Sequence, residues 1–280
     1  MKDDFEQRFI NYYTAHRQGQ LAQAEKGYQE LLKQQPDSGQ VLRALGNLFL
    51  DQDQPDKAIP VFEKAAGLNP PDLSACYNLG RLRQLENDHQ GAIAIYTRML
   101  DQKPDSGLVW NNLGVAYRAL GQPADAVASY KKAVRFSPDM AEAWNNLGVA
   151  QEESGEADLA EDAVYSYTKA IEIQPDYASP HLNLGVCLQK SKQFEQAEHH
   201  YRMVLKIQPD NETAAFLLQS LVGDETPDAA PVEHVRNIFD QCADHFESIL
   251  VDQLAYQTPK RLFDLVRPYL SQNMAVLDLG

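Results

Sequence analysis

Proline recurs about every 34 residues along most of this chain, which has 280 residues in all. Four prolines are equally spaced, and two more continue the series after one slightly longer interval: Pro36, Pro70, Pro104, Pro138, Pro175 and Pro209. A repeat of this length is typical of a solenoid, because one repeat cannot bury its apolar face alone and must stack on its neighbours. The sequence therefore predicts an array of stacked repeats.

Small and bulky residues recur in the same order between these prolines. One complete copy contains Trp110, Leu113, Gly114, Tyr117, Ala126, Tyr130 and Pro138. Residues at this spacing share one face of a helix, the glycine lets a second helix approach closely, and the proline cannot continue a helix. We expect six pairs of antiparallel helices, followed by a partial capping helix that ends at residue 222. The expected repeats span residues 5–38, 39–72, 73–106, 107–140, 141–177 and 178–211.

This pattern resembles the tetratricopeptide repeat (TPR), whose signature W-x2-L-G-x2-Y, A-x3-F, P is matched by that copy without a gap. The resemblance implies an all-α superhelical solenoid over residues 1–222, with a concave inner face. The first repeat has Arg8, Asn11 and Tyr12 where bulky apolar residues and glycine are expected, as in a terminal cap. The fifth repeat has three extra residues within 154–162, which we expect to enlarge its acidic turn.

Asparagine occupies the same place in four successive repeats, one residue before the Leu-Gly pair, at Asn78, Asn112, Asn146 and Asn183. Asparagine in a helix costs about 0.6 kcal/mol relative to alanine, so four in register favour a role beyond packing. A side-chain amide has a donor and an acceptor, which can pair with the backbone of an extended peptide. The alternative is that the amides were duplicated with the repeat and are solvated or bonded within their own helix.

The row of asparagines resembles the asparagine ladder in the TPR superhelix of O-linked N-acetylglucosamine transferases, which grips a peptide main chain. This resemblance, together with Arg81 and Arg118 on the adjoining face, predicts a groove that binds a protein or an extended peptide. We expect neighbouring polar residues, including Asn111 and Asn145, to line the same groove.

The composition disfavours several partners. Asp and Glu number 40 against 25 Lys and Arg, so the net charge is -15, which argues against nucleic acid and anionic membrane surfaces. The sequence has neither a secretory signal nor an apolar run of about 18 residues, and its three cysteines are widely spaced, so we expect a cytoplasmic protein. His199 and His200 lack the spacing of a zinc site, so we expect them on a solvated helix face and predict no metal site. The identity of the groove ligand and the oligomeric state stay open.

The pattern changes after residue 222. A segment rich in Gly, Pro and acidic residues, 223–231, is expected to be a linker. Two amphipathic helices and a short apolar strand, Val276-Leu277-Asp278-Leu279-Gly280, are expected to follow. This order resembles the opening of a class I S-adenosylmethionine-dependent methyltransferase, of the kind that follows TPR units in some bacterial proteins.

The resemblance implies that residues 232–280 are the start of a Rossmann-like α/β domain, with Asp278 and Gly280 at the beginning of its cofactor loop. The remaining glycines and all catalytic residues of such a domain are absent from the sequence. We therefore expect a full-length methyltransferase that uses S-adenosylmethionine, and a 280-residue chain, cut off at Gly280, that is inactive and binds no cofactor. The alternative is a non-enzymatic TPR adaptor, and coding sequence beyond Gly280 would distinguish the two.

Overall fold

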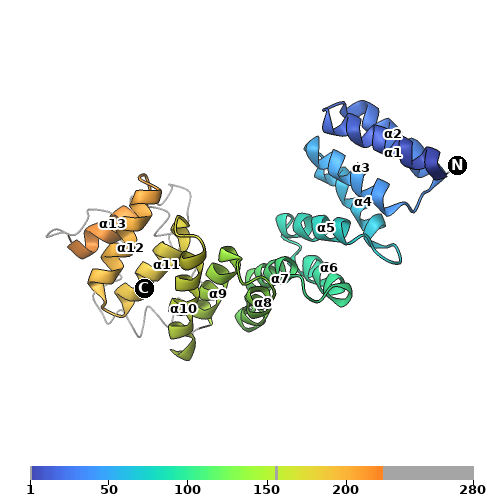
Figure 1. Ribbon diagram of the computed structural model, residues 1–280. Coiled ribbons are helices and arrows are strands. Elements are labelled where there is room, and N and C mark those ends of the chain that lie inside the picture. The colour runs from blue at the N-terminus through green and yellow to red at the C-terminus, as the bar shows by residue number, and fades with distance from the viewer. Residues whose placement is uncertain (1, 155–156, 223–280) are drawn as a thin grey trace, which may run out of the picture. The chain divides into compact units, whose positions relative to one another are not determined.

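The computed structural model describes residues 2–154 and 157–222, and every regular element in these ranges is an α-helix (Figure 1). The described residues fall into two compact units, which divide between residues 173 and 174 and are described separately. The predicted linker and the predicted Rossmann-like segment, residues 223–280, lie outside the described residues. The first unit contains α1 (Lys2–Arg17), α2 (Leu21–Gln34), α3 (Gly39–Asp51), α4 (Pro55–Ala66), α5 (Leu73–Leu85), α6 (His89–Gln102), α7 (Gly107–Ala119), α8 (Pro123–Phe136), α9 (Ala141–Glu153) and α10 (Ala157–Ile173). The second contains α11 (Ala178–Lys190), α12 (Phe194–Ile207) and α13 (Glu212–Val222).

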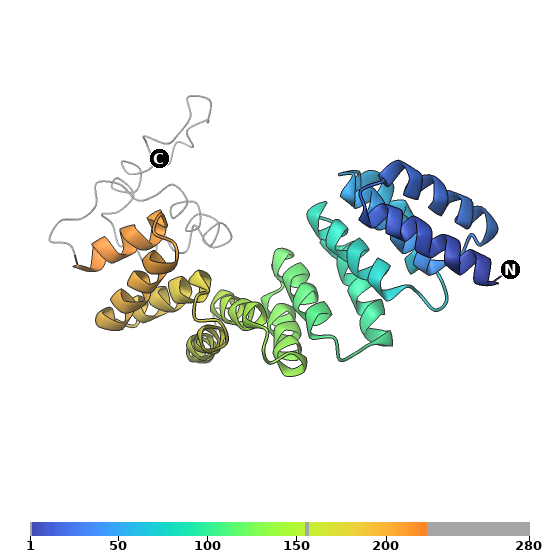
Figure 2. The same ribbon diagram turned by 45° about the horizontal axis from the view of Figure 1, so that its top comes forward.

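Consecutive helices pack as pairs, α1 with α2, α3 with α4 and so on to α11 with α12. The two members of a pair run side by side in both views of the molecule (Figures 1 and 2). We call the odd-numbered members, α1 to α11, first helices and the even-numbered members, α2 to α12, second helices. None of the described helices combines the length and the apolar character needed to cross a membrane.

An aromatic ring from the second helix packs directly on a glycine of the first helix. A Cβ atom placed on Gly80 would lie 2.7 Å from Cζ of Tyr96, whose side chain is fully buried. Only glycine permits this approach, so the glycine and the ring of each pair depend on each other. The same contact joins Gly46 to Phe62, Gly114 to Tyr130, Gly148 to Tyr167 and Gly185 to Tyr201.

The first repeat makes this contact with the two partners exchanged. Gly27 is on the second helix α2, and the ring that covers it belongs to Tyr12 on the first helix α1. The signature expects a glycine near position 12 of α1, and the tyrosine there is accommodated by Gly27 on the partner helix α2. The close approach of the two helices is retained although the signature is not.

The extra residues of the fifth repeat lengthen a helix, so the prediction of an enlarged turn is wrong. Helix α10 has 17 residues, whereas the second helices α8 and α12 have 14 each. Residues 154–156 separate α9 from α10, and residues 120–122 separate α7 from α8, so the two connections are equally long. The inserted segment continues α10 at its N-terminal end.

The recurrent proline also anchors the repeat that follows it. The indole N–H of Trp110 donates to the carbonyl oxygen of Pro104 at 2.8 Å, and that of Trp144 donates to Pro138 at 2.9 Å. In the second unit, Nε2 of His181 takes the place of the indole nitrogen, 3.1 Å from the carbonyl oxygen of Pro175. This hydrogen bond fixes the start of each of these first helices against the preceding connection.

Candidate functional site

The first helices of the first unit contact one another along the array. Helix α1 contacts α3, α3 contacts α5, α5 contacts α7, and α7 contacts α9. Asn78 on α5, Asn112 on α7 and Asn146 on α9 are half-buried at this row of helices. Asn183 is half-buried at the corresponding place on α11, in the second unit. We call the surface that carries Asn78, Asn112 and Asn146 the inner face.

Two of these asparagines are bonded to an amide on the preceding first helix. Nδ2 of Asn78 donates to Oδ1 of Asn47 on α3 at 2.8 Å, and Nδ2 of Asn146 donates to Oδ1 of Asn111 on α7 at 3.1 Å. Their own Oδ1 atoms have no hydrogen bond within the described part of the chain. These side chains therefore connect neighbouring helices and still offer an acceptor on the inner face.

Asn112 differs from the other two. Its Nδ2 atom is buried without a partner among the described residues. Its backbone carbonyl accepts a hydrogen bond from Nε2 of Gln84 at 3.1 Å, and Gln84 also accepts the Tyr96 hydroxyl at 2.8 Å. Gln84 thus connects α7 to the preceding helix pair. The unpartnered Nδ2 of Asn112 can donate a hydrogen bond to a ligand if its side chain rotates toward the inner face.

The two predicted arginines have different surroundings. Nε of Arg118 lies 2.8 and 3.0 Å from the two carboxylate oxygens of Glu153, so its charge is already paired across α7 and α9. Arg81 on α5 is exposed and forms no ion pair or hydrogen bond within the ranges that the structure describes. Of these two arginines, only Arg81 therefore has a charge that is free to pair with a ligand.

The prediction that Asn111 and Asn145 line the groove is wrong. The two residues are 1% and 6% exposed, because they lie between first helices and not on the inner face. Nδ2 of Asn111 donates to Glu142 on α9 at 3.4 Å, and its Oδ1 accepts from Asn146. Adjacent asparagines on one helix therefore differ: Asn112 and Asn146 lie on the inner face, whereas Asn111 and Asn145 are buried.

A pocket on the inner face lies among α3, α5, α6 and the start of α7. We call it the groove pocket. It is lined by Arg43, Asn47, Leu73, Ser74, Tyr77, Asn78, Met99, Lys103, Ser106, Leu108 and Val109. The repeat pattern predicted Asn78 in this region but gave no sign of Arg43, Asn47 and Lys103, which occupy repeat positions that carry other residue types elsewhere.

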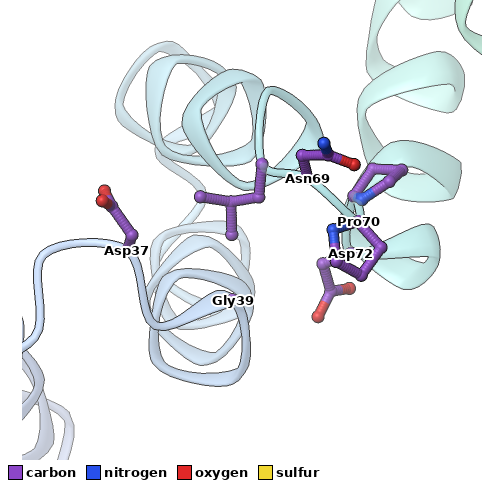
Figure 3. A pocket seen from close by; sticks show the side chains of 7 residues that line it. Asp37, Gly39, Asn69, Pro70 and Asp72 are labelled. Atoms are coloured by element: carbon purple, nitrogen blue, oxygen red, sulfur yellow. The ribbon is translucent and has the colours of Figure 1, made fainter.

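A second hollow lies between the connections that precede α3 and α5 (Figure 3). Its two carboxylates, Asp37 and Asp72, are both ion-paired, to Lys64 at 3.5 Å and to Arg43 at 2.9 Å. Asp72 also accepts the backbone N–H of Ala75 at 2.9 Å and so caps α5. These charges therefore have structural partners, and the hollow is not the site that we favour.

The histidines do not all lie on a solvated face as predicted. His199 is exposed, but His200 is half-buried, and its Nδ1 lies 2.9 Å from Nδ1 of the buried His181. Because Nε2 of His181 contacts a carbonyl oxygen, it carries a proton, so Nδ1 of His181 is the acceptor and Nδ1 of His200 the donor. No group of three potential metal-binding side chains occurs among the described residues.

This histidine pair makes the second unit sensitive to acid. Burial, followed by the neighbouring His181 and His199, lowers the pKa of His200 to about 4, and burial lowers that of His181 below its usual value. Because the folded protein disfavours the protonated form of His200, the free energy of unfolding is highest above about pH 6.5, where the imidazole is neutral in both states. It decreases as the pH falls from 6.5 toward 4, where the unfolded state takes up the proton first. Because solvent screens the half-exposed ring, we expect the free energy of unfolding of the second unit to fall by only about 1–2 kcal/mol between pH 7.5 and pH 5. Hydrogen exchange of α11 and α12 at pH 7.5 and pH 5 measures it.

The matched variant is His200→Gln, because glutamine keeps a donor but does not titrate. We expect its exchange protection to change less between the two pH values than that of the wild type. An equal change in both proteins would contradict the assignment to His200.

Four repeat-family models match most of the described chain. Models described as tetratricopeptide repeat match residues 14–72, 49–113 and 178–211, and one described as TPR repeat matches residues 116–155 and 160–192. No curated protein matches the sequence.

Solved structures of repeat proteins resemble the chain in fold. One of them, "Crystal structure of YrrB: a TPR protein with an unusual peptide-binding site", has a TM-score of 0.57 at 20% identity, covering 67% of this chain and 95% of that one. The MamA protein has a TM-score of 0.55 at 25% identity, covering 64% and 96%. One chain of the APC/C hetero-tetramer Cut9–Hcn1 has a TM-score of 0.58 at 17% identity, covering 76% and 42%.

Proposed function

Because the chain is a tetratricopeptide repeat protein, we propose that it binds an extended segment of a partner protein on its inner face. The observation that carries this proposal is the row of half-buried amides on successive first helices, Asn78, Asn112 and Asn146. Asn183 occupies the equivalent position on α11 of the second unit, and we propose the same role for it there.

The chemistry of the row suits a peptide backbone. The Oδ1 atoms of Asn78 and Asn146 can accept backbone N–H groups, and the Asn112 amide can donate to a carbonyl. An extended peptide presents such groups at regular intervals whatever its side chains. Each bond contributes about 0.5–1.5 kcal/mol, so affinity builds up with the number of repeats engaged. The unusual peptide-binding site of YrrB supports the proposal by analogy.

Site-specific photo-crosslinking tests this proposal. Leu85 lies on α5 about two turns after Asn78 and therefore on the same side of that helix, and Leu108 lies in the groove pocket. They are 76% and 42% exposed. Phe136 on α8 and Tyr165 on α10 are 39% and 56% exposed and serve as matched positions on second helices. A photoreactive phenylalanine analogue is introduced at each position of the full chain, which is irradiated in extract of the source cells.

We expect the same partner segment to be crosslinked at Leu85 and Leu108, and much less at the two positions on second helices. Mass spectrometry of the crosslinked peptides gives the segment and the yield. Equal yields at all four positions would contradict binding on the inner face.

We further propose that residues 232–280 belong to a methyltransferase-like domain that uses S-adenosylmethionine. This proposal rests on the sequence alone, in particular on Asp278 and Gly280 within Val-Leu-Asp-Leu-Gly. The intact mass of the endogenous protein tests it. A mass well above 31.4 kDa supports a methyltransferase, and a mass of 31.4 kDa supports an adaptor without chemistry of its own.

A further inference from the structure

The groove pocket differs in charge from the rest of the molecule. Its lining contains two cations, Arg43 and Lys103, and no acidic side chain, although the whole chain has a net charge of -15. The acidic residues closest to Lys103 in the sequence, Asp101 and Asp105, are not part of the lining. The charged side chains that line the pocket are therefore opposite in sign to the net charge of the protein.

The two cations have different roles. Nη1 of Arg43 is held by Oδ2 of Asp72 at 2.9 Å, which neutralises its charge and fixes the guanidinium at the pocket wall. Lys103, just after α6, is exposed and has no ion pair within the described ranges. The uncompensated positive charge of the pocket is therefore that of Lys103.

The rest of the lining combines an apolar wall with a pair of amides. Leu73, Met99, Leu108 and Val109 form the apolar part, and Leu108 is 42% exposed. The bond from Asn78 to Asn47 leaves Nδ2 of Asn47 as a donor and Oδ1 of Asn78 as an acceptor in the same pocket. In an extended peptide the N–H and C=O groups of one residue point to the same side, so a single residue of the bound segment can offer a partner to each atom.

We propose that the groove pocket selects a carboxylate next to an apolar side chain in the bound segment. The carboxylate pairs with Lys103, the apolar side chain packs on Leu108 and Met99, and the backbone N–H and C=O of one residue of the segment pair with the two amides. The net charge alone favours basic or neutral partners, whereas this pocket specifies an acidic residue at one position. The inference rests on the proposed function and adds the chemistry of the recognised segment.

Labelled peptides test this inference on the full chain by fluorescence polarisation. The probe is a capped Gly/Ser peptide with a central Leu-Glu pair, and its comparison peptide has Leu-Gln at the same place. A third peptide ends in leucine with a free C-terminal carboxylate, which distinguishes a chain terminus from an acidic side chain as the source of the charge. The protein variants are Lys103→Gln and, as a control, Lys131→Gln, which removes an exposed charge on α8.

We expect the wild type and Lys131→Gln to bind the Leu-Glu peptide about tenfold more tightly than the Leu-Gln peptide. The ratio should fall to about one in Lys103→Gln. Tight binding of the leucine-terminated peptide alone would assign the charge to a chain terminus and overturn the selection of an acidic residue. Equal binding of all three peptides by the wild type would overturn the inference while leaving the proposed function intact. Binding of none would also overturn it, and the crosslinking yields would then decide the proposed function separately.

Discussion

Replacing Tyr96 with alanine is expected to lower the free energy of unfolding by about 3–5 kcal/mol. The ring is fully buried and packs on Gly80, which has no side chain to fill the resulting cavity. Each repeat is also stabilised by its neighbours, so the loss spreads to the adjacent pairs. Urea denaturation followed by circular dichroism measures it. Thr97→Ala, at the exposed next position of α6, is the control and should change stability by less than about 0.5 kcal/mol.

Replacing these buried tyrosines with phenylalanine separates the stabilising contribution of the hydroxyl group from that of the ring. The hydroxyls of Tyr96 and Tyr201 donate to Gln84 and Gln189 at 2.8 and 2.7 Å, so Tyr96→Phe and Tyr201→Phe should each cost about 1 kcal/mol. The hydroxyl of Tyr130 is buried without a partner among the described residues. In its repeat, the position equivalent to Gln84 is Arg118, whose guanidinium is paired with Glu153. Tyr130→Phe should therefore be neutral or stabilising. A clear loss of stability there would contradict the assignment.

The apolar packing of the array could be predicted from the sequence. The positions of Gly114 and Tyr130 recur with the repeat, and the structure places the ring on the glycine. Apolar packing depends mainly on side-chain volume and helical face, which a periodic pattern records directly. The length of α10 was not predicted, because three additional residues fit either a turn or one more turn of helix.

The polar contacts of the inner face could not be predicted in the same way. Asn78 is 31 residues from its partner Asn47, and Asn146 is 35 residues from Asn111, so the two bonds do not share one sequence interval. These bonds join different positions of neighbouring repeats, and they depend on the rotamers that the packed helices allow. For the same reason, the pairing of Arg118 with Glu153 and the groove pocket with Lys103 emerged only from the structure.

Replacing the four asparagines of the row with alanine is expected to weaken binding of the partner segment at least about thirtyfold. Four hydrogen bonds of about 0.5–1.5 kcal/mol each amount to roughly 2–6 kcal/mol. The substitutions also remove the bonds to Asn47 and Asn111, but alanine favours the helix more than asparagine does. We therefore expect the variant to retain its helices, which circular dichroism and thermal denaturation can verify. The substitutions are at Asn78, Asn112, Asn146 and Asn183.

The most direct test of binding on the inner face is a calorimetric titration of the crosslinked partner segment into three proteins at one salt concentration. These are the wild type, the four-asparagine variant and a control variant in which four exposed second-helix glutamines become alanine: Gln23, Gln90, Gln102 and Gln196. We predict that affinity is retained in the control and falls at least about thirtyfold in the asparagine variant. Equal affinity in all three proteins would contradict the assignment of the asparagine row as the peptide-binding site.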